Sequence, residues 1–191
     1  MTEEATPSTS GASSEDLVLR SRYAVVMDTS QLRETLARQL RHSQAQAGLS
    51  AALEGFPTDL AGRQVAGHRH TAWQQVEHMR LAAEDLIAYC QRADYKALPW
   101  PDGYWPKSPQ PPSAEVWSTS NRRLLDATEK MAGMVEDPNV DLYANVPTAE
   151  QAHHHTLRAA LILLDHNGYH TAQVIALRQA LSIWPEVGVT S

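Results

Sequence analysis

Apolar side chains recur every three to four residues along four stretches of the chain, and each stretch predicts an amphipathic helix. The predicted helices cover residues 29–53, 71–92, 113–135, and 150 or 152 to 183. Ser113 is a suitable N-cap for the third of them. The last would be more than about 45 Å long at 1.5 Å per residue. Because no period-two alternation persists, no sheet is expected, and the pattern predicts an all-α four-helix bundle.

The segments between the helices carry residues that interrupt regular structure. Residues 54–62 hold two glycines and a proline, and residues 97–112 hold six prolines and two tryptophans. The second segment predicts a long crossover loop, ordered and held against the body by Trp100, Tyr104 and Trp105. Residues 1–20 have almost no large apolar side chains, which predicts a disordered tail ahead of one domain over 21–191.

Composition limits the classes of function. The chain has 191 residues and a formal net charge of −6, and it lacks a block of Lys and Arg, so nucleic-acid binding is not expected. Its longest apolar run, Ala159–Leu164, is too short to span a bilayer. The N-terminus lacks the cationic start and apolar centre of a signal peptide, so a cytoplasmic protein is expected. These features argue against nucleic acid and membrane as partners.

The cysteine content restricts any metal site. Cys90 is the one cysteine, which rules out an intrachain disulfide and a cysteine-rich zinc site. It falls among apolar residues of the second helix, where a buried, unreactive thiol is expected. A metal ion would therefore have to be bound by histidines and carboxylates.

Three histidines lie where apolar side chains are expected. His166 and His170 are one helical turn apart, and their imidazoles can meet at a single point. They interrupt an apolar stripe of the last helix, which comprises Ala159, Leu163, Val174, Leu177 and Leu181. His78 falls on the apolar side of the second helix. Three neutral imidazoles with an open fourth position are typical of catalytic Zn²⁺ or Ni²⁺ sites. Core histidines satisfied by hydrogen bonds remain the alternative.

Other polar residues are secondary candidates. Asp85, one heptad from His78, is a candidate base or a partner that orients a ligand; an ion pair with an arginine of another helix is the alternative. Gln173 could hydrogen-bond a ligand. The run His153–His155 lies too far along the helix, roughly 16 Å from His166 to its nearest member, to share the same ion. It is expected to line a pocket mouth, to cap the helix, or to be solvated.

Three segments resemble the DinB-like family. Leu164–Arg178 (LDHNGYHTAQVIALR) closely resembles the family's last-helix signature, Trp73–Arg80 (WQQVEHMR) is similar to its second-helix motif, and Pro99–Pro106 (PWPDGYWP) is similar to a loop of one subgroup. The resemblance implies an up-down-down-up bundle, often a homodimer, with a divalent metal held by His78, His166 and His170. Where many subgroup members have a glycine-rich approach to the last helix, this chain has Ala152–His155.

Family relatives include transferases and isomerases that use bacillithiol, mycothiol or glutathione. The resemblance therefore favours a metal-dependent enzyme of the thiol-dependent transferase or hydrolase type that acts on a small-molecule substrate, with Zn²⁺ or Ni²⁺ as cofactor and a low-molecular-weight thiol as a candidate second cofactor. Asp85 is its tentative catalytic residue. A metal-binding stress or sensor protein without turnover is the alternative function, and a bundle with purely structural histidines is the third.

Overall fold

The computed structural model describes residues 29–42 and 45–185. Within them the regular structure is helical and contains no strand, so the prediction of an all-α fold is confirmed; the tail predicted for residues 1–20 lies outside the described residues. The helices are residues 29–41, α2 (Leu49–Leu53), α3 (Ala72–Gln91), α4 (Ala114–Glu136) and α5 (Thr156–Ala180). Two short 3₁₀ turns, η1 (Thr58–Leu60) and η2 (Asp102–Tyr104), lie in the connections.

The starts of α3 and α4 follow the capping residues visible in the sequence. Thr71 accepts a hydrogen bond from the backbone of Gln74, and the Gln74 side chain accepts one from the backbone of Thr71, forming a capping box. Ser113 caps α4 by accepting from the backbone N–H of Val116. The predicted boundaries of both helices are therefore confirmed to within one residue.

The helix predicted for residues 29–53 is wrong in one respect, because it is broken into two. Its first part ends at residue 41, and α2 begins after Gly48, whose backbone is extended (φ −79°, ψ 172°). Each part is held by a different partner. Arg33 donates to three carbonyls in the last turn of α4 and just after it, whereas Arg178 of α5 donates to the carbonyls of Ala52 and Glu54.

The last helix is also shorter than predicted. It begins at Thr156 rather than at 150 or 152, and it ends at Ala180 rather than 183. The preceding residues pair with another segment instead, because the backbone N–H of Val146 donates to the carbonyl of His154 at 2.9 Å. The His155 side chain then accepts from the backbone N–H of Arg158 and caps the helix. The 25 residues of α5 span about 37 Å.

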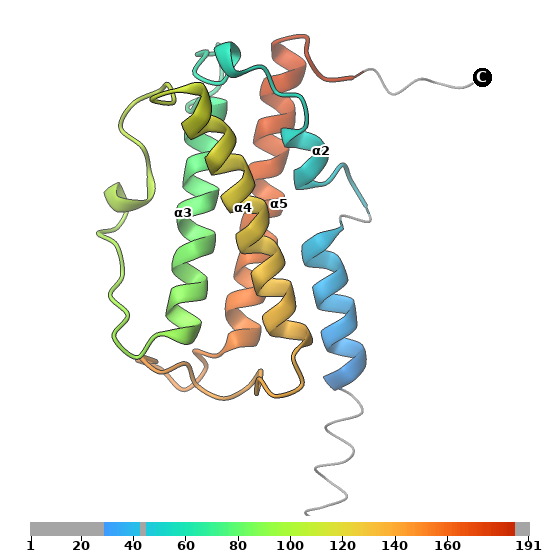
Figure 1. The fold of residues 1–191 in the computed structure, drawn as a ribbon, viewed down its shortest axis with the longest axis vertical. Helices are drawn as coiled ribbons and strands as arrows, with labels where there is room; N and C mark the ends of the chain where they lie inside the picture. The colour runs from blue at the N-terminus through green and yellow to red at the C-terminus, as the bar shows by residue number, and fades with distance from the viewer. Residues whose placement is uncertain (1–28, 43–44, 186–191) are drawn as a thin grey trace, which may run out of the picture.

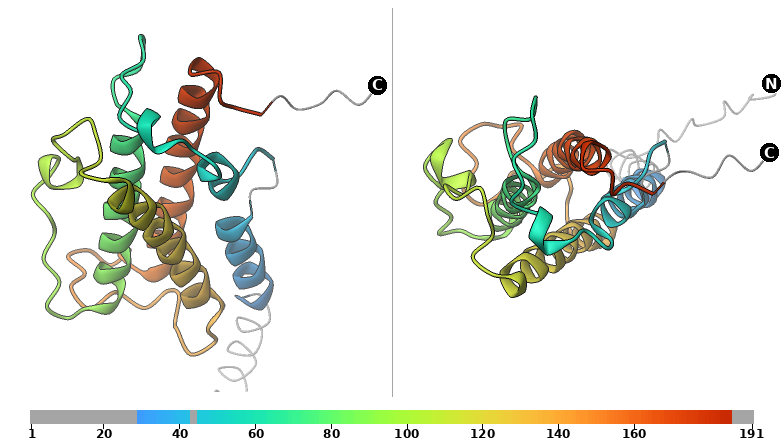
Figure 2. Two further views of the ribbon diagram at one scale, coloured as in Figure 1. Left: turned by 45° about the horizontal axis from the view of Figure 1, so that its top comes forward. Right: turned by 90° about the horizontal axis from the view of Figure 1, so that it is seen from above.

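The helices enclose one apolar interior. Figures 1 and 2 show α3, α4, α5 and the helix over 29–41 around it, with α3 against both α4 and α5. The largest fully buried apolar side chains are Met79, Leu124, Met131, Leu142, Leu163 and Leu177. The connection from α3 to α4 runs along the outside of α3 (Figure 1). Tyr104 is buried and anchors this loop, as predicted. Trp100 is 79% exposed, so the anchoring role predicted for Trp100 is wrong.

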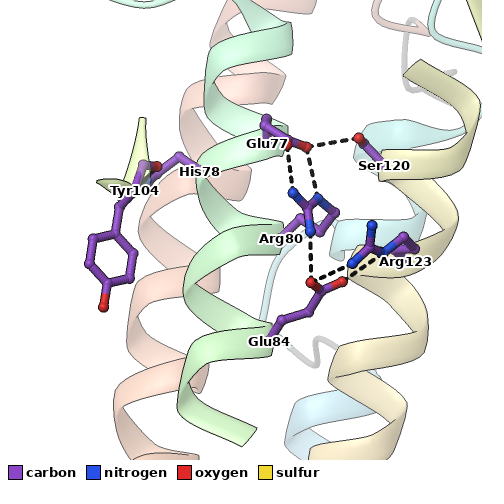
Figure 3. Close-up of polar contacts among 7 residues, drawn as sticks. All are labelled: Glu77, His78, Arg80, Glu84, Tyr104, Ser120 and Arg123. Atoms are coloured by element: carbon purple, nitrogen blue, oxygen red, sulfur yellow. Dashed lines mark hydrogen bonds and ion pairs between the residues drawn. The ribbon is translucent and has the colours of Figure 1, made fainter. Parts of the chain in front are cut away.

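A charged cluster fills the contact between α3 and α4 (Figure 3). The guanidinium of Arg80, whose side chain is 9% exposed, forms ion pairs with Glu77 at 2.6 Å and Glu84 at 2.7 Å. From α4, Ser120 donates to Glu77 and Arg123 donates to Glu84. The polar side of α3 is thus an interface with α4, and His78 lies on the opposite side of the helix.

Breaking this cluster should destabilise the fold. Arg80→Met leaves the Glu77 carboxylate largely buried without its ion pair, so the free energy of unfolding should fall by about 3 kcal/mol. Arg38→Met is the matched control, because it also removes an arginine–glutamate pair, but one whose side chains are 58% and 69% exposed. The control should change stability by less than about 1 kcal/mol. Urea unfolding of both variants checks this, and equal losses would contradict the assigned role of Arg80.

Candidate metal centre

Three imidazoles from two helices meet in the interior between α3 and α5. His78 of α3 and His166 and His170 of α5 each present a ring nitrogen, and these three atoms lie within 4.8 Å of one another. His78 and His170 are buried, and His166 is partly buried. The residues singled out by their helical spacing are therefore brought together, and the cluster could hold a metal ion.

Two of the rings are oriented through their outer nitrogens. The Nδ1–H of His78 donates to the backbone carbonyl of Tyr104 at 2.9 Å, and the Nδ1–H of His170 donates to Oε1 of Gln75 at 2.6 Å. Carbonyl acceptors at this position fix the tautomer and leave Nε2 with its lone pair, the arrangement that metal-bound histidines use. Gln75, which sequence analysis did not single out, is thus a positioning residue.

The spacing of the inner nitrogens suits one ion. Nε2 of His78 and Nε2 of His166 are 2.9 Å apart. Two nitrogens bound to a single Zn²⁺ at 2.0–2.1 Å are separated by about 3.0–3.4 Å, depending on the coordination angle. The widest separation in the cluster, 4.8 Å, would have to close by about 1.4–1.8 Å, which requires the side chains to adjust when the ion binds. The donor set and spacing therefore fit a divalent cation.

Two orphaned polar atoms lie next to the cluster. Nδ1 of His166 and Oδ1 of Asn167 are both buried without a hydrogen-bond partner within the described residues. Because Nδ1 of His78 donates to Tyr104, its Nε2 accepts, so His166 carries its proton on Nε2 and donates it. A cation bound at that nitrogen would move the proton to Nδ1, and the Asn167 side chain, which already acts on the pKa of His166, could accept it.

Burial keeps the three rings neutral. Desolvation is the largest effect on each: it lowers the pKa of His78, and with repulsion from neighbouring imidazoles it lowers the pKa of His166 to about 4 and that of His170 to about 3. For His166 the Asn167 side chain acts in the opposite direction. Neutral imidazole is the form that binds metal, so at pH 7 the cluster needs to lose no proton before binding.

The crossover loop covers the cluster with an aromatic ring. Trp105 stacks on His78 with ring centroids 3.8 Å apart and an interplanar angle of 6°, and on its other face it stacks on His70 at 4.0 Å. The sequence predicts that Trp105 anchors this loop, and these contacts confirm it, but the two histidine rings were not predicted as its partners. The proline-rich composition of the loop predicted its order, but its register over α3 depends on contacts far apart in the sequence.

Asp85 reaches the cluster through this loop rather than directly. Its Oδ2 accepts hydrogen bonds from the hydroxyls of Tyr95 and Tyr104, both at 2.8 Å. Because the carbonyl of Tyr104 holds His78, Asp85 acts as a positioning residue for that ring. The partners of Asp85 are tyrosines, so the alternative prediction of an ion pair with an arginine is wrong. The role of Asp85 as a base stays a prediction.

The remaining candidates lie apart from the three histidines. His155 caps α5, and Nδ1 of His154 lies 2.7 Å from the hydroxyl of Tyr89, while His153 is exposed. Burial raises the pKa of the Cys90 thiol to about 11, so it is largely protonated at neutral pH, as the prediction of an unreactive thiol requires.

No family model, curated protein or solved structure matches this chain. Among residues 29–42 and 45–185, no helix combines the length and apolar character that crossing a membrane requires. The function proposed for the site therefore rests on its geometry.

The lowered histidine pKa values predict a pH-dependent loss of stability in the metal-free protein. Unfolded imidazole titrates near 6.5, while His166 and His170 titrate at about 4 and 3 in the folded chain. Protons therefore bind the unfolded state first, and stability present above pH 6.5 is lost as pH falls towards 3.

Chemical denaturation at pH 7 and pH 5 measures this loss. The double variant His166→Asn, His170→Gln should lose at least about 1 kcal/mol less than the parent chain over that interval, after allowance for solvent screening. Equal losses in both proteins would show that the two imidazoles are not protected from protonation by the fold.

Proposed function

We propose that this protein binds one divalent metal ion through His78, His166 and His170. The observation that carries the proposal is the convergence of three neutral imidazoles, two of which are fixed through Nδ1 on carbonyl oxygens. Nδ1 of His166 and Oδ1 of Asn167, both buried without a hydrogen-bond partner among the described residues, add support, because a proton that a bound ion displaces to Nδ1 could be donated to the Asn167 side chain. Such outer contacts contribute to metal affinity in known histidine sites.

The donor set favours zinc or nickel. Three imidazoles without a thiolate suit borderline divalent cations, whereas calcium and magnesium prefer oxygen ligands. Three protein ligands leave a coordination position open, which is the arrangement of catalytic sites. When bound, the ion supplies Lewis acidity and lowers the pKa of a water or thiol in the open position.

We propose a metal-dependent enzyme of the transferase or hydrolase type, with a low-molecular-weight thiol as a candidate cofactor. The chain's own residues would contribute binding and order around the ion. Gln75 and the Tyr104 carbonyl would orient two ligand rings. Trp105, stacked on His78, would exclude water from that side.

We also propose that the chain is a DinB-like four-helix bundle of up-down-down-up order. The long connection along the outside of α3 (Figure 1) supports a parallel pair, because it carries the chain back along the helix before α4 begins. A homodimer is part of the same proposal. Its support is an apolar part of α5 in which Leu161 is 51% exposed, Ile162 37% and Tyr169 64%.

A metal-binding sensor without turnover is the second candidate. The observation that favours it is the Trp105 ring, which lies parallel to His78 at 3.8 Å and limits approach from that direction. A metal held beneath such a cover could report on metal supply through the order of the crossover loop. Turnover distinguishes this function from the first.

Metal binding is tested on protein prepared without chelators. The parent chain should bind about one Zn²⁺ per chain, and His166→Ala should weaken the affinity by more than about tenfold, because even outer contacts are worth that much. His153→Ala is the matched control, since it removes an exposed histidine of the same helix approach. It should bind zinc as the parent does.

Competition with a chromophoric chelator measures these affinities, with circular dichroism to confirm that each variant is folded. Equal zinc affinity in His166→Ala and the parent would refute the three-histidine site. Thiol-dependent turnover of an electrophilic acceptor that His166→Ala abolishes would favour the enzyme. A loaded protein that turns over no acceptor in a broad panel would favour the sensor.

A further inference from the structure

A cavity lies beside α3 and α5, displaced along both helices from the three histidines. It encloses about 470 Å³ between the last turns of α3, the start of the crossover loop, the segment before α5 and the first turn of α5. Asp85 and Arg158 both line it. At 1.5 Å per residue, Asp85 is about 10 Å along α3 from His78, and Arg158 is about 12 Å along α5 from His166. A small molecule could therefore extend between the two sites.

Hydrogen-bond donors without partners face this cavity. Arg158, which is half-buried, forms no ion pair with any residue of the described ranges. Oγ1 of Thr148 is buried, and no described residue hydrogen-bonds to it. A buried hydroxyl and a guanidinium left without acceptors are unfavourable unless water or a ligand supplies them. Both side chains line the cavity.

A tyrosine–histidine pair adds a further donor. The hydroxyl of Tyr89 lies 2.7 Å from Nδ1 of His154. When Tyr89 donates to Nδ1, the neutral ring carries its proton on Nε2 and can donate it in turn. The charge of Arg158 acts on both groups. Burial raises the pKa of Tyr89, and the Arg158 charge opposes that rise. Burial also lowers the pKa of His154, and the Arg158 charge is the second cause of that lowering. The Arg158 guanidinium therefore lies near both Tyr89 and His154.

The acceptors in the cavity are fewer and are occupied or exposed. Oδ2 of Asp85 already accepts from two tyrosine hydroxyls. Glu150 is exposed, and its charge acts on the pKa values of Tyr89 and His154 in the opposite direction to that of Arg158. Lys96, which also lines the cavity and is exposed, adds a positive charge. The half-buried part is left with donors from Arg158 and Thr148 and with the His154 ring, a set that complements an acceptor with several oxygens.

We propose that this cavity binds the oxyanion group of a small molecule, a carboxylate or a phosphate, with Arg158 as the principal contact. The planar fork of a guanidinium matches both groups and forms paired, charge-assisted hydrogen bonds with them. Thr148 and His154 are the further donors that line the cavity. As a binding site the cavity stands on its own contacts. As an anchor for a substrate whose reacting end lies at the histidines, it rests on the proposed function.

Calorimetric titration of the full chain tests the proposal with succinate, inorganic phosphate and neutral succinamide. Succinate or phosphate should bind, and succinamide should bind at least about tenfold more weakly, since a hydrogen bond to a charged group contributes about 1.5–3 kcal/mol. The tighter of the two anions identifies the source of the oxyanion. Binding of neither anion in preference to succinamide would overturn the proposal.

Variants locate the binding in the cavity. Arg158→Gln should weaken the preferred anion at least about tenfold, and Thr148→Val should weaken it less, through the loss of one donor. Arg122→Gln, at an exposed position of α4, is the matched control and should bind the anion as the parent does. Equal affinity in Arg158→Gln and Arg122→Gln would overturn the assignment, whereas thermal unfolding shows that each variant is folded.

Zinc titration of the same proteins separates the two proposals. Arg158→Gln should keep the zinc affinity of the parent, because Arg158 contacts no ligand ring. An anion site in a protein that binds no zinc would refute the metal proposal and leave the anion site intact. Zinc binding without any preference for an anion would refute the anion site and leave the metal proposal intact.

Discussion

The burial of three imidazole rings between α3 and α5 is the constraint on which much of the structure depends. Each ring loses hydration, and an unpaired polar group in such a place costs a few kcal/mol. His78 and His170 recover part of this through carbonyl acceptors. One of those acceptors belongs to Tyr104, so the crossover loop must be fixed for the site to form, and the Asp85 carboxylate fixes it through the Tyr104 hydroxyl. Site, loop and helix are thus one connected arrangement.

The α3 helix serves two interfaces of opposite character. One side carries the Arg80 cluster, which packs on α4, and the other carries His78, which packs towards α5 (Figure 3). The charged side ties α3 to α4 through partners of defined geometry, so the helix can rotate or slide little without breaking ion pairs. That restraint holds His78 opposite His166 and lets an adjustment of side chains, rather than of helices, close the cluster around an ion.

The sequence predicts the features of the fold and the site that depend on interactions within a few residues. The Ser113 cap and the spacing of His166 and His170 follow from hydrogen bonds and helix geometry within a few residues. Contacts between separate segments of the chain were not predictable in this way. The start of α5, displaced by the pairing of Val146 with His154, is one case, and the Tyr104 carbonyl and Gln75 amide that orient the histidines are another.

The most direct test of the central claim is anomalous diffraction at the zinc absorption edge from crystals grown with one equivalent of Zn²⁺. The account predicts a single strong peak about 2.0–2.1 Å from Nε2 of His78, His166 and His170. Nδ1 of His166 should then donate a hydrogen bond to the Asn167 side chain. A peak at His153–His155 instead, or none between α3 and α5, would contradict it.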